Sequence, residues 1–256
     1  MHCRWTSLAL LLAWLAVAQE LSTSLLLESQ MVLQRGFEVI VSCQRVDGSW
    51  NGECGLTARC LLALAATGLQ GDYAPLKPNY EAAMAFLRDH AAECPPKDAP
   101  LLVCALIRAG GSVQKEAAAM LGGFGERMEE GEALCTMDAL CLSGAYKTGE
   151  GNLVLRRLMG RQQRPAYKAA AAALCSRDVP HLSVRQDCAD EEELYWATRA
   201  LLARPEAADG NWRNTAVSML LDRLKADGAW GDPAEALSAR LRATAFALQT
   251  IILCIP

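Results

Sequence analysis

The residues best suited to chemistry are the acids of segment 187–193, whose sequence is DCADEEE. Carboxylates gathered in this way can hold a cation or deliver a proton, which makes Asp187, Asp190 and Glu191 the candidate catalytic residues. A structural interpretation competes with this one. Asp190 is a natural helix N-cap, Glu193 follows it at the spacing of a capping box, and the other acids suit the positive end of a helix dipole. We give the capping interpretation more weight.

Other kinds of catalytic or metal site find little support. No Cys-x-x-Cys pair occurs, which argues against a standard zinc or redox motif. His90 and His181 are the only histidines after residue 2, and we interpret them as surface or helix-end residues. Ser143 and Ser176 lack the surroundings of a nucleophile elbow, and the glycines of 122–125 indicate a loop between helices and no phosphate cradle. We therefore expect no cofactor and no metal.

The charge of the chain argues against one class of partner. The 256 residues carry a formal net charge of −4, and no basic cluster is longer than a pair. Binding to nucleic acid depends on phosphate neutralisation by clustered cations. Nucleic-acid binding is therefore disfavoured.

The N-terminus has the features of a secretory signal peptide: Arg4, an apolar run over 8–17 and small residues at 16–18. The run is about half of the ~20 residues that a membrane-spanning helix needs. We expect cleavage after residue 18 and no membrane span afterwards. The protein is then exported, as a periplasmic or secreted protein, with a signal peptide at 1–18 and a single domain at 19–256.

The sequence has 11 cysteines, and loss of a signal peptide that carries Cys3 leaves an even number in an exported chain. Cysteines inside apolar helical segments act as small hydrophobes, and we expect them to remain free thiols. Cysteines at helix ends or in loops are better placed for disulfides, and two of them flank one turn that a bridge could close. The expected core thiols include Cys104, Cys135, Cys141 and Cys175; the loop cysteines are Cys43, Cys54, Cys94 and Cys188, of which Cys43 and Cys54 flank the turn.

Strand signals are nearly absent, and alanine-rich helical segments separated by Gly and Pro recur along the chain. The segment 79–92 is amphipathic, whereas 55–67, 98–109 and 166–177 are uniformly small and apolar. A helix that is apolar all round is buried and one with a polar stripe faces solvent, so the alternation predicts an inner and an outer set of helices. One outer helix is missing or short, in 178–184. Helices are expected near 24–44, 55–67, 79–92, 98–109, 113–128, 132–146, 152–162, 166–177, 190–204, 211–225 and 238–253.

Two turns that contain a tryptophan carry most of the information on architecture. In 44–50 (QRVDGSW), Asp-Gly forms a tight turn, because Asp bonds its following backbone and Gly tolerates a positive φ. Gln44 can donate to carbonyls left free at the end of the preceding helix, and Trp50 adds a large apolar surface with one N–H that needs a partner. Segment 224–230 (LKADGAW) repeats the turn with leucine at the glutamine position, which indicates internal repetition. The motif residues are Gln44, Asp47, Gly48 and Trp50 in the first copy and Asp227, Gly228 and Trp230 in the second.

The first turn and its two helices resemble the QW repeat of the squalene-cyclase and protein-prenyltransferase superfamily. A basic residue and glycine (35–36) open the pattern, Gln44 and Trp50 stand six residues apart, and an alanine- and leucine-rich helix follows. The aromatic residue usual at the fifth position is replaced by Val39. The resemblance implies an all-α fold, the α/α toroid of about six helical hairpins in inner and outer rings. It also implies that the Gln–Trp arrangement joins neighbouring hairpins.

The C-terminal third strengthens this resemblance. Segment 194–198 (LYWAT), the second turn and 243–245 (ATA) are similar to the last hairpins of exported bacterial proteins with prenyltransferase or squalene-oxidase repeats. Most of those proteins lack an assigned reaction. Trp212 follows an Asp-Gly-Asn sequence but precedes a helix. We therefore interpret it as an early residue of that helix and not as part of a third tryptophan turn.

The same resemblance gives little support for the chemistry of the superfamily. Squalene-type cyclases protonate an alkene with an Asp-x-Asp-Asp motif, which this chain lacks. They also stabilise carbocations with cavity aromatics, whereas the expected inner helices here are filled with alanine, leucine and cysteine, so the interior should be filled or narrow. Prenyltransferases of this fold bind zinc through Asp, Cys and His, but Asp187 and Cys188 are adjacent and no histidine follows them. The tryptophans left after the signal peptide are Trp50, Trp196, Trp212 and Trp230.

The leading hypothesis is an exported α/α-toroid repeat protein with a non-catalytic binding or scaffold role, and its partner is a protein or small molecule. One alternative is a cyclase-like or lyase-like enzyme, terpenoid-cyclase-like in chemistry, that uses the acidic cluster at the toroid mouth. Another is an open helical-repeat scaffold. Ring closure separates the leading hypothesis from the open scaffold. A deep polar cavity of ~300 Å³ or more separates the enzyme from both.

Overall fold

The computed structural model describes residues 21–108, 129–143, 149–160, 162–208 and 210–255. The expected signal peptide and the expected helix at 113–128 lie outside the described residues. Within the described ranges the chain is helical, and its one β feature is an isolated bridge between Leu182 and Ala208. The prediction of an all-α fold is confirmed.

The helices match the expected segments to within a few residues at each end. A short outer helix, α10, begins at Val184, the last residue of the stretch 178–184 that lacked a predicted helix. Short 3-10 helices at Gly71–Leu76, Ala91–Glu93 and Pro205–Ala207 were not anticipated. The α-helices are α2 (Thr23–Ser42), α3 (Cys54–Ala66), α4 (Lys77–Asp89), α5 (Ala99–Arg108), α7 (Glu130–Ser143), α8 (Gly149–Met159), α9 (Pro165–Leu174), α10 (Val184–Asp187), α11 (Glu191–Ala203), α12 (Trp212–Arg223) and α13 (Leu237–Cys254).

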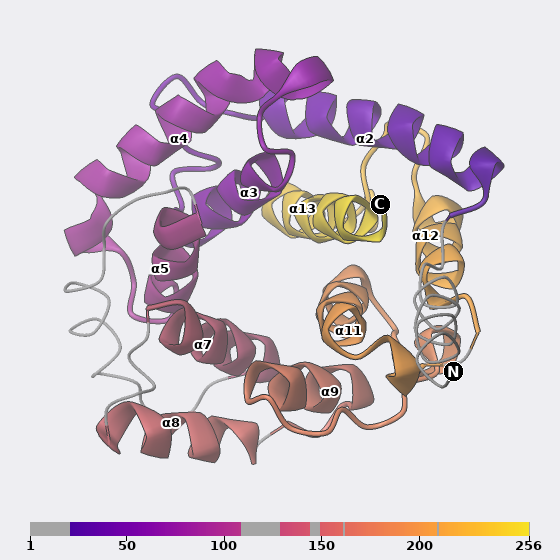
Figure 1. Ribbon diagram of the computed structural model, residues 1–256. Coiled ribbons are helices and arrows are strands. Elements are labelled where there is room, and N and C mark those ends of the chain that lie inside the picture. Colours follow the sequence, from indigo (N-terminus) through magenta and orange to yellow (C-terminus); the bar gives the residue numbers. More distant parts are fainter. Residues whose placement is uncertain (1–20, 109–128, 144–148, 161, 209, 256) are drawn as a thin grey trace, which may run out of the picture.

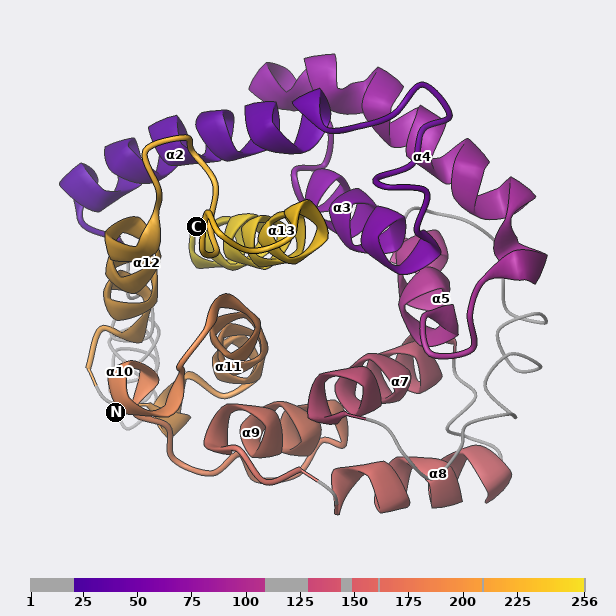
Figure 2. The same cartoon turned by 180° about the vertical axis from the view of Figure 1, so that it is seen from behind.

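The helices are arranged as an inner and an outer set around a common centre (Figure 1). Helices α3, α5, α7, α9, α11 and α13 form the inner set; each packs against the next, and α13 packs back against α3. Helices α2, α4, α8, α10 and α12 lie outside them (Figures 1 and 2). The contact between α2 and α12 joins the two ends of the outer set, and there the Ser22 backbone N–H donates to Asn214 Oδ1 at 3.2 Å.

Burial follows the hydrophobic pattern of each helix. Every residue of α3 from Cys54 to Leu64 is buried, as expected for a helix that is apolar all round. The outer helix α4 buries only Ala83, Met84, Phe86 and Leu87, which form one stripe. The alternation of the two patterns along the chain therefore explains which helices lie inside.

The two tryptophan turns have the same hydrogen bonds. The Trp50 indole N–H donates to the Ile40 carbonyl at 2.7 Å, and that of Trp230 donates to the Leu220 carbonyl at 2.8 Å. In each turn the aspartate accepts from the backbone N–H two residues later, and the glycine has a positive φ of 85° or 82°. Each tryptophan backbone N–H donates to a threonine hydroxyl of the next inner helix, Thr57 or Thr244. Both turns lie against their preceding helices, and both face the viewer in Figure 2, at the same end of the molecule.

Gln44 acts differently from the prediction. Helix α2 ends at Ser42, and the Gln44 amide donates to the carbonyls of Gly48 and Asn79, each at 2.9 Å, and not to the last carbonyls of α2. Asn79 returns a hydrogen bond to Gln44 Oε1. Because Asn79 belongs to α4, the glutamine joins its own turn to the next outer helix.

The second turn occupies the equivalent place at the junction of the chain ends. A Cβ at Gly48 would clash with the Ala82 backbone of α4, and a Cβ at Gly228 would lie 3.2 Å from Arg35 Cβ of α2. Each turn therefore approaches the outer helix that comes next around the ring. Leu224 stands at this junction in the place of the glutamine. Here α13 packs closely on α2: a Cβ added to Gly36 of α2 would clash with the Leu248 side chain of α13.

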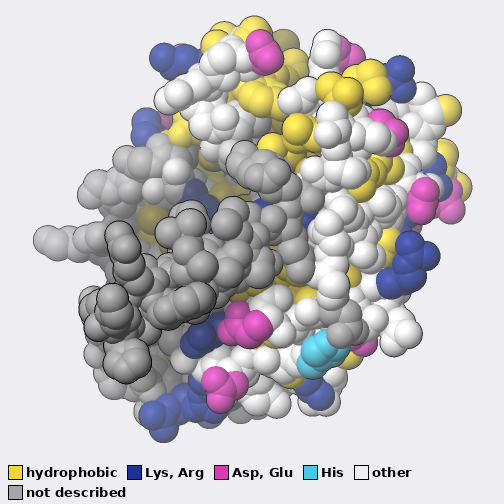
Figure 3. Space-filling view, turned by 45° about the vertical axis from the view of Figure 1, so that its right-hand side comes forward, with side chains coloured by type: hydrophobic (Ala, Val, Ile, Leu, Met, Phe, Trp, Pro, Cys, Tyr) yellow, Lys and Arg dark blue, Asp and Glu magenta, His cyan; other side chains and the backbone are white. Residues whose placement is uncertain are grey.

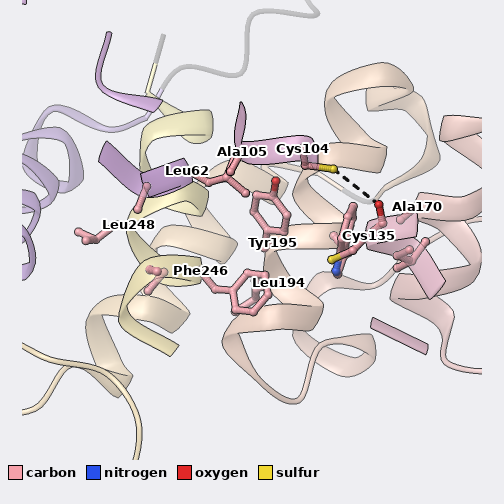
Figure 4. Close-up of a cluster of buried hydrophobic side chains, with 14 of the residues drawn as sticks. Leu62, Cys104, Ala105, Cys135, Ala170, Leu194, Tyr195, Phe246 and Leu248 are labelled. Atoms are coloured by element: carbon pink, nitrogen blue, oxygen red, sulfur yellow. Dashed lines mark hydrogen bonds between the residues drawn. The ribbon is translucent and has the colours of Figure 1, made fainter. Parts of the chain in front are cut away.

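The centre of the ring is filled along part of its length. Figure 4 shows buried side chains from all six inner helices meeting there, including Tyr195 and Phe246, whose ring centroids are 5.4 Å apart. Cys104 donates through its thiol to the Cys135 carbonyl at 3.6 Å. The prediction of a filled interior holds for this layer.

Among the described helices, α13 has the length and mean hydropathy of a membrane-crossing helix, 18 residues at 1.2. It packs against α2, α3, α11 and α12, and 56% of its residues are buried. This is the position of a core helix in the ring.

Candidate ligand cavity at the start of the inner helices

A polar cavity of about 500 Å³ opens at the end of the ring where the inner helices begin. All six inner helices contribute residues from their first two turns or from just before them, so the cavity lies on the ring axis. The expectation of a filled or narrow interior is wrong at this end. The lining residues are Gly55, Arg59, Lys97, Asp98, Leu101, Glu129, Glu130, Gly131, Glu132, Cys135, Arg164, Tyr167, Asp190, Glu192 and Arg242.

Arg59 is the deepest charged group of the cavity. It stands on α3 among residues that are all buried, and only 7% of it is exposed. Its guanidinium lies 3.9 Å above the centroid of the Phe246 ring, and one N–H donates to the Cys135 sulfur at 3.6 Å. Its Nε has no hydrogen-bond partner, and within the described residues no carboxylate comes close enough to form an ion pair with Arg59. A buried cation beside an open cavity thus has no ion pair within the described residues, and Glu192 acts on it only at longer range.

Two carboxylates approach the cavity over glycines. The Glu192 carboxylate lies where a side chain at Gly131 would be, and the Asp98 carboxylate lies where one at Gly55 would be. Burial raises the pKa of Glu192, against the opposing effect of Arg59 and Arg242. Burial also raises the pKa of Asp98, which Lys97 and Arg242 oppose. Both acids therefore bind a proton more readily than exposed carboxylates do.

Other acids at this end are already used to cap helices. Asp190 is the N-cap of α11 and accepts from the Glu193 backbone N–H at 2.8 Å. Glu193 in turn accepts from the Ala189 backbone N–H and from Arg164 at 2.8 Å. Glu130 accepts from the backbone N–H groups that precede α9. The capping interpretation of Asp190 is thus confirmed, and these acids have their partners within the protein.

The structure separates the three candidate catalytic residues. Asp190 lines the cavity as a cap, while Asp187 and Glu191 are not among its lining residues. Asp187 accepts from the Ser183 backbone N–H at 2.8 Å, and Glu191 lies 4.0 Å from Arg223. The triad does not form one acidic site.

The cavity residues that sequence reasoning missed are Arg59, Asp98 and Glu192. One signal could have found Arg59: it is the single charged residue in the apolar segment 54–66. A charge inside a helix that is otherwise apolar all round is buried, and a buried charge needs a reason. No comparable signal separates Glu192 from its acidic neighbours.

The residues of the tryptophan turns have structural roles. None of Gln44, Asp47, Gly48, Trp50, Asp227, Gly228 and Trp230 lines the cavity. Within the described residues no group of three or more His, Cys, Asp or Glu side chains is arranged to hold a metal ion. His90 stacks on Phe86 at 4.3 Å between ring centroids and hydrogen-bonds the Phe86 carbonyl through Nδ1.

A second buried charged group lies one helical turn beyond Cys135 on α7. Asp138 accepts from Arg199 at 2.7 and 2.9 Å, one bond to each oxygen, and from Arg108 at 2.8 Å. Burial alone would raise the pKa of Asp138, but the two arginines outweigh it and hold the pKa below its ordinary value. This cluster is closed, because both oxygens of the carboxylate accept hydrogen bonds from the arginines.

The surface of the ring has no comparable concentration of charge on the face shown in Figure 3, where basic and acidic side chains are interspersed.

No protein-family model, no curated protein and no solved structure matches this chain.

Proposed function

We propose that this protein is an exported α/α toroid, of the type found in the squalene-cyclase and prenyltransferase superfamily, that binds a small polar ligand in its axial cavity without transforming it. The observation that carries the proposal is Arg59, a buried guanidinium that faces the cavity without a carboxylate partner. A protein tolerates such a group where a ligand supplies the missing negative charge.

The packing of the helices supports a toroid over an open scaffold. In an open helical repeat each unit contacts only its sequence neighbours. Here α13 packs against α3, and α12 packs against α2, so the last hairpin contacts the first in both sets of helices. The duplicated tryptophan turns support the relation to the superfamily, because each joins an outer helix to an inner one.

The size and lining of the cavity support a small ligand. Binding sites for small molecules occupy about 300–1,000 Å³, and this cavity has about 500 Å³. Charged residues dominate the lining, so the ligand is polar. The export of the chain rests on the basic, apolar and small-residue pattern of the first 18 residues.

One observation favours an enzyme as the second candidate. Glu192 lies in the cavity with a raised pKa, as a general acid requires, and Arg59 can hold an anionic substrate beside it. A terpenoid-cyclase-like reaction fits the site poorly, because Tyr167 is the one aromatic among the described residues that line it, and Arg59 covers Phe246. An acid-assisted lyase-like reaction on a polar substrate is the form of the alternative that the lining supports.

The proposal is tested by screening a library of small polar metabolites for compounds that raise the thermal unfolding midpoint. A cavity ligand should stabilise the wild type, lose its effect in Arg59→Met and keep it in Arg185→Met, an exposed arginine outside the cavity. If no compound stabilises the wild type, the binding role is wrong. If a binding compound is also converted, and Glu192→Gln stops conversion while retaining binding, the enzyme replaces the binder.

A further inference from the structure

The cavity contains charges of both signs that the protein does not pair within hydrogen-bond distance. Arg59 and Arg242 are the cations in question, on α3 and α13; Asp98 and Glu192 are the acids, before α5 and on α11. They interact at longer range, since Arg59 and Arg242 each act to lower the pKa of both acids. This distinguishes them from Arg164, Glu193 and Glu130, which are engaged in caps and an ion pair.

The buried positive charge and the two negative charges occupy different positions in the cavity. Arg59 is buried at the floor beside Cys135 and Phe246, whereas Arg242 is exposed. The Glu192 and Asp98 carboxylates stand over Gly131 and Gly55, on α7 and α3. A ligand with only a negative charge would satisfy Arg59 but would lie among two carboxylates, and one with only a positive charge would leave Arg59 unpaired.

We propose that the ligand is a small zwitterion of the amino-acid type, with its carboxylate on the Arg59 guanidinium and its protonated amine toward Glu192 and Asp98. The inference rests on the proposed binding function and names the ligand class. A carboxylate matches the fork of guanidinium N–H donors, and an ammonium group matches acids that accept hydrogen bonds. The free volume exceeds that of the charged ends, so a side chain of the ligand can occupy the rest of the cavity.

The test measures binding of free amino acids and of two derivatives of each by titration calorimetry. The panel contains glycine, leucine, phenylalanine, glutamate and lysine, each with its N-acetyl form, which lacks the ammonium, and its carboxamide, which lacks the carboxylate. We expect at least one free amino acid to bind ten-fold or more tightly than both of its derivatives. We expect Arg59→Met to abolish that binding and Glu192→Gln to weaken it ten-fold or more.

Matched variants keep the result interpretable. Arg59→Lys retains the charge and should bind more weakly than wild type with the same order of preference. Arg185→Met should bind as wild type does, and circular dichroism should show that every variant is folded. Equal binding of an amino acid and its N-acetyl form would overturn the zwitterion in favour of a plain anion. Failure of the whole panel, while the metabolite library yields another cavity ligand, would overturn the zwitterion and leave the binding function standing.

A second inference comes from an independent observation on the cysteines. The thiol of Cys54, the first residue of α3, lies 3.9 Å from the His90 carbonyl, four residues before Cys94 in the segment that leads to α5. The two thiols are close enough that each affects the pKa of the other. The sequence places Cys43 and Cys54 on either side of one turn that a bridge could close, but the thiol that acts on the pKa of Cys54 is that of Cys94. Two neighbouring thiols on different hairpins are candidates for a disulfide.

We infer that Cys54 and Cys94 form a disulfide when the chain meets an oxidising compartment. The oxidant is a disulfide, either of an oxidoreductase or of a small thiol. One cysteine loses its proton and attacks that disulfide to form a mixed disulfide, and the second thiolate then displaces the reduced thiol. Two protein thiols are oxidised, one disulfide is reduced to two thiols, and the new bond ties the start of α3 to the segment that carries Asp98.

The test is incubation of the folded protein with oxidised glutathione, followed by unfolding without reductant, alkylation and peptide mass spectrometry. We expect a linked Cys54–Cys94 peptide, with Cys104 and Cys135 alkylated because they are buried in the ring core. Cys94→Ser should leave Cys54 alkylated or glutathionylated. A linked Cys43–Cys54 peptide, or full alkylation of Cys54 and Cys94 in the wild type, would overturn the inference.

Discussion

Asp138 and Arg59 are both buried charged groups on the inner helices, yet their surroundings differ. Asp138 receives three hydrogen bonds from two arginines, while Arg59 has a thiol, an aromatic face and an Nε without partner. Asp138 faces a closed cluster and Arg59 faces a cavity of about 500 Å³. A buried charge with a full set of partners belongs to the architecture, and one without partners beside a cavity marks a ligand site.

The difference also has an energetic meaning. Removing one member of a satisfied buried ion pair leaves the other without compensation, which costs several kcal/mol. Removing a buried charge that has no ion pair takes away a desolvation cost and breaks no hydrogen-bonded ion pair. The two sites should therefore respond in opposite directions when their charge is removed.

The largest effect is expected at the closed cluster. Asp138→Asn keeps the volume of the side chain but leaves Arg199 and Arg108 without a counter-ion, so the free energy of unfolding should fall by about 3–5 kcal/mol. Urea denaturation measures it, with Asp222→Asn at an exposed acid as the control. A loss no greater than that of the control would mean that the cluster is not what stabilises this part of the ring.

The pH dependence of stability should have opposite signs for Asp138 in the closed cluster and Glu192 in the cavity. The pKa of Asp138 lies below its ordinary value of 3.8, so its contribution to stability is present above that value and is lost as the pH falls through the lowered pKa. The pKa of Glu192 lies above its ordinary value of 4.5, so its contribution is present below that value and is lost as the pH rises through the raised pKa. Urea midpoints measured against pH should therefore show the difference between wild type and Asp138→Asn shrinking in acid. As the pH rises toward neutral, the urea midpoint of Glu192→Gln should increase relative to that of the wild type.

Arg59→Met should leave stability unchanged or raise it by up to about 2 kcal/mol, because a methionine packs on Phe246 without a buried charge. The same variant should lose binding of the cavity ligand, which makes Arg59 a residue kept for function at a cost in stability. Paired urea denaturation and titration calorimetry measure both quantities. A loss of several kcal/mol would place Arg59 with Asp138 among the architectural charges.

Sequence patterns predicted the helices and their sorting well because both depend on local information. The apolar character of α3 predicted its burial, and Asp190 was identified as a cap from the spacing to Glu193. The partners of side chains depend on tertiary contacts that no local pattern contains. Gln44 bonds Asn79, 35 residues away, and Asp138 bonds Arg199, 61 residues away, so neither pair could be assigned from the sequence.

The cavity was missed for a related reason. Its residues come from six segments, none of which is a motif, and they meet only because the inner helices begin at one end of the ring. The acidic segment predicted Asp187 and Glu191 as site residues, but it is Glu192 of α11 that lines the cavity. The composition of the inner helices correctly predicted the filled core in Figure 4 and could not reveal the opening above it.

The smallest expected effect concerns Asp190, which lines the cavity as Arg59 does but is satisfied as Asp138 is. Its carboxylate accepts from the Glu193 backbone N–H, and asparagine can do the same, so Asp190→Asn should change stability by only a few tenths of a kcal/mol. Asp190→Ala removes the acceptor and should cost about 1 kcal/mol. Neither variant should change affinity for the cavity ligand by more than a few fold, because the side chain is engaged by its own helix. The opposite result would be an Asp190→Ala variant that keeps the stability of the wild type and no longer binds the ligand. Asp190 would then be a binding residue and not a cap, and the other capping acids of the cavity would belong to the binding site as well.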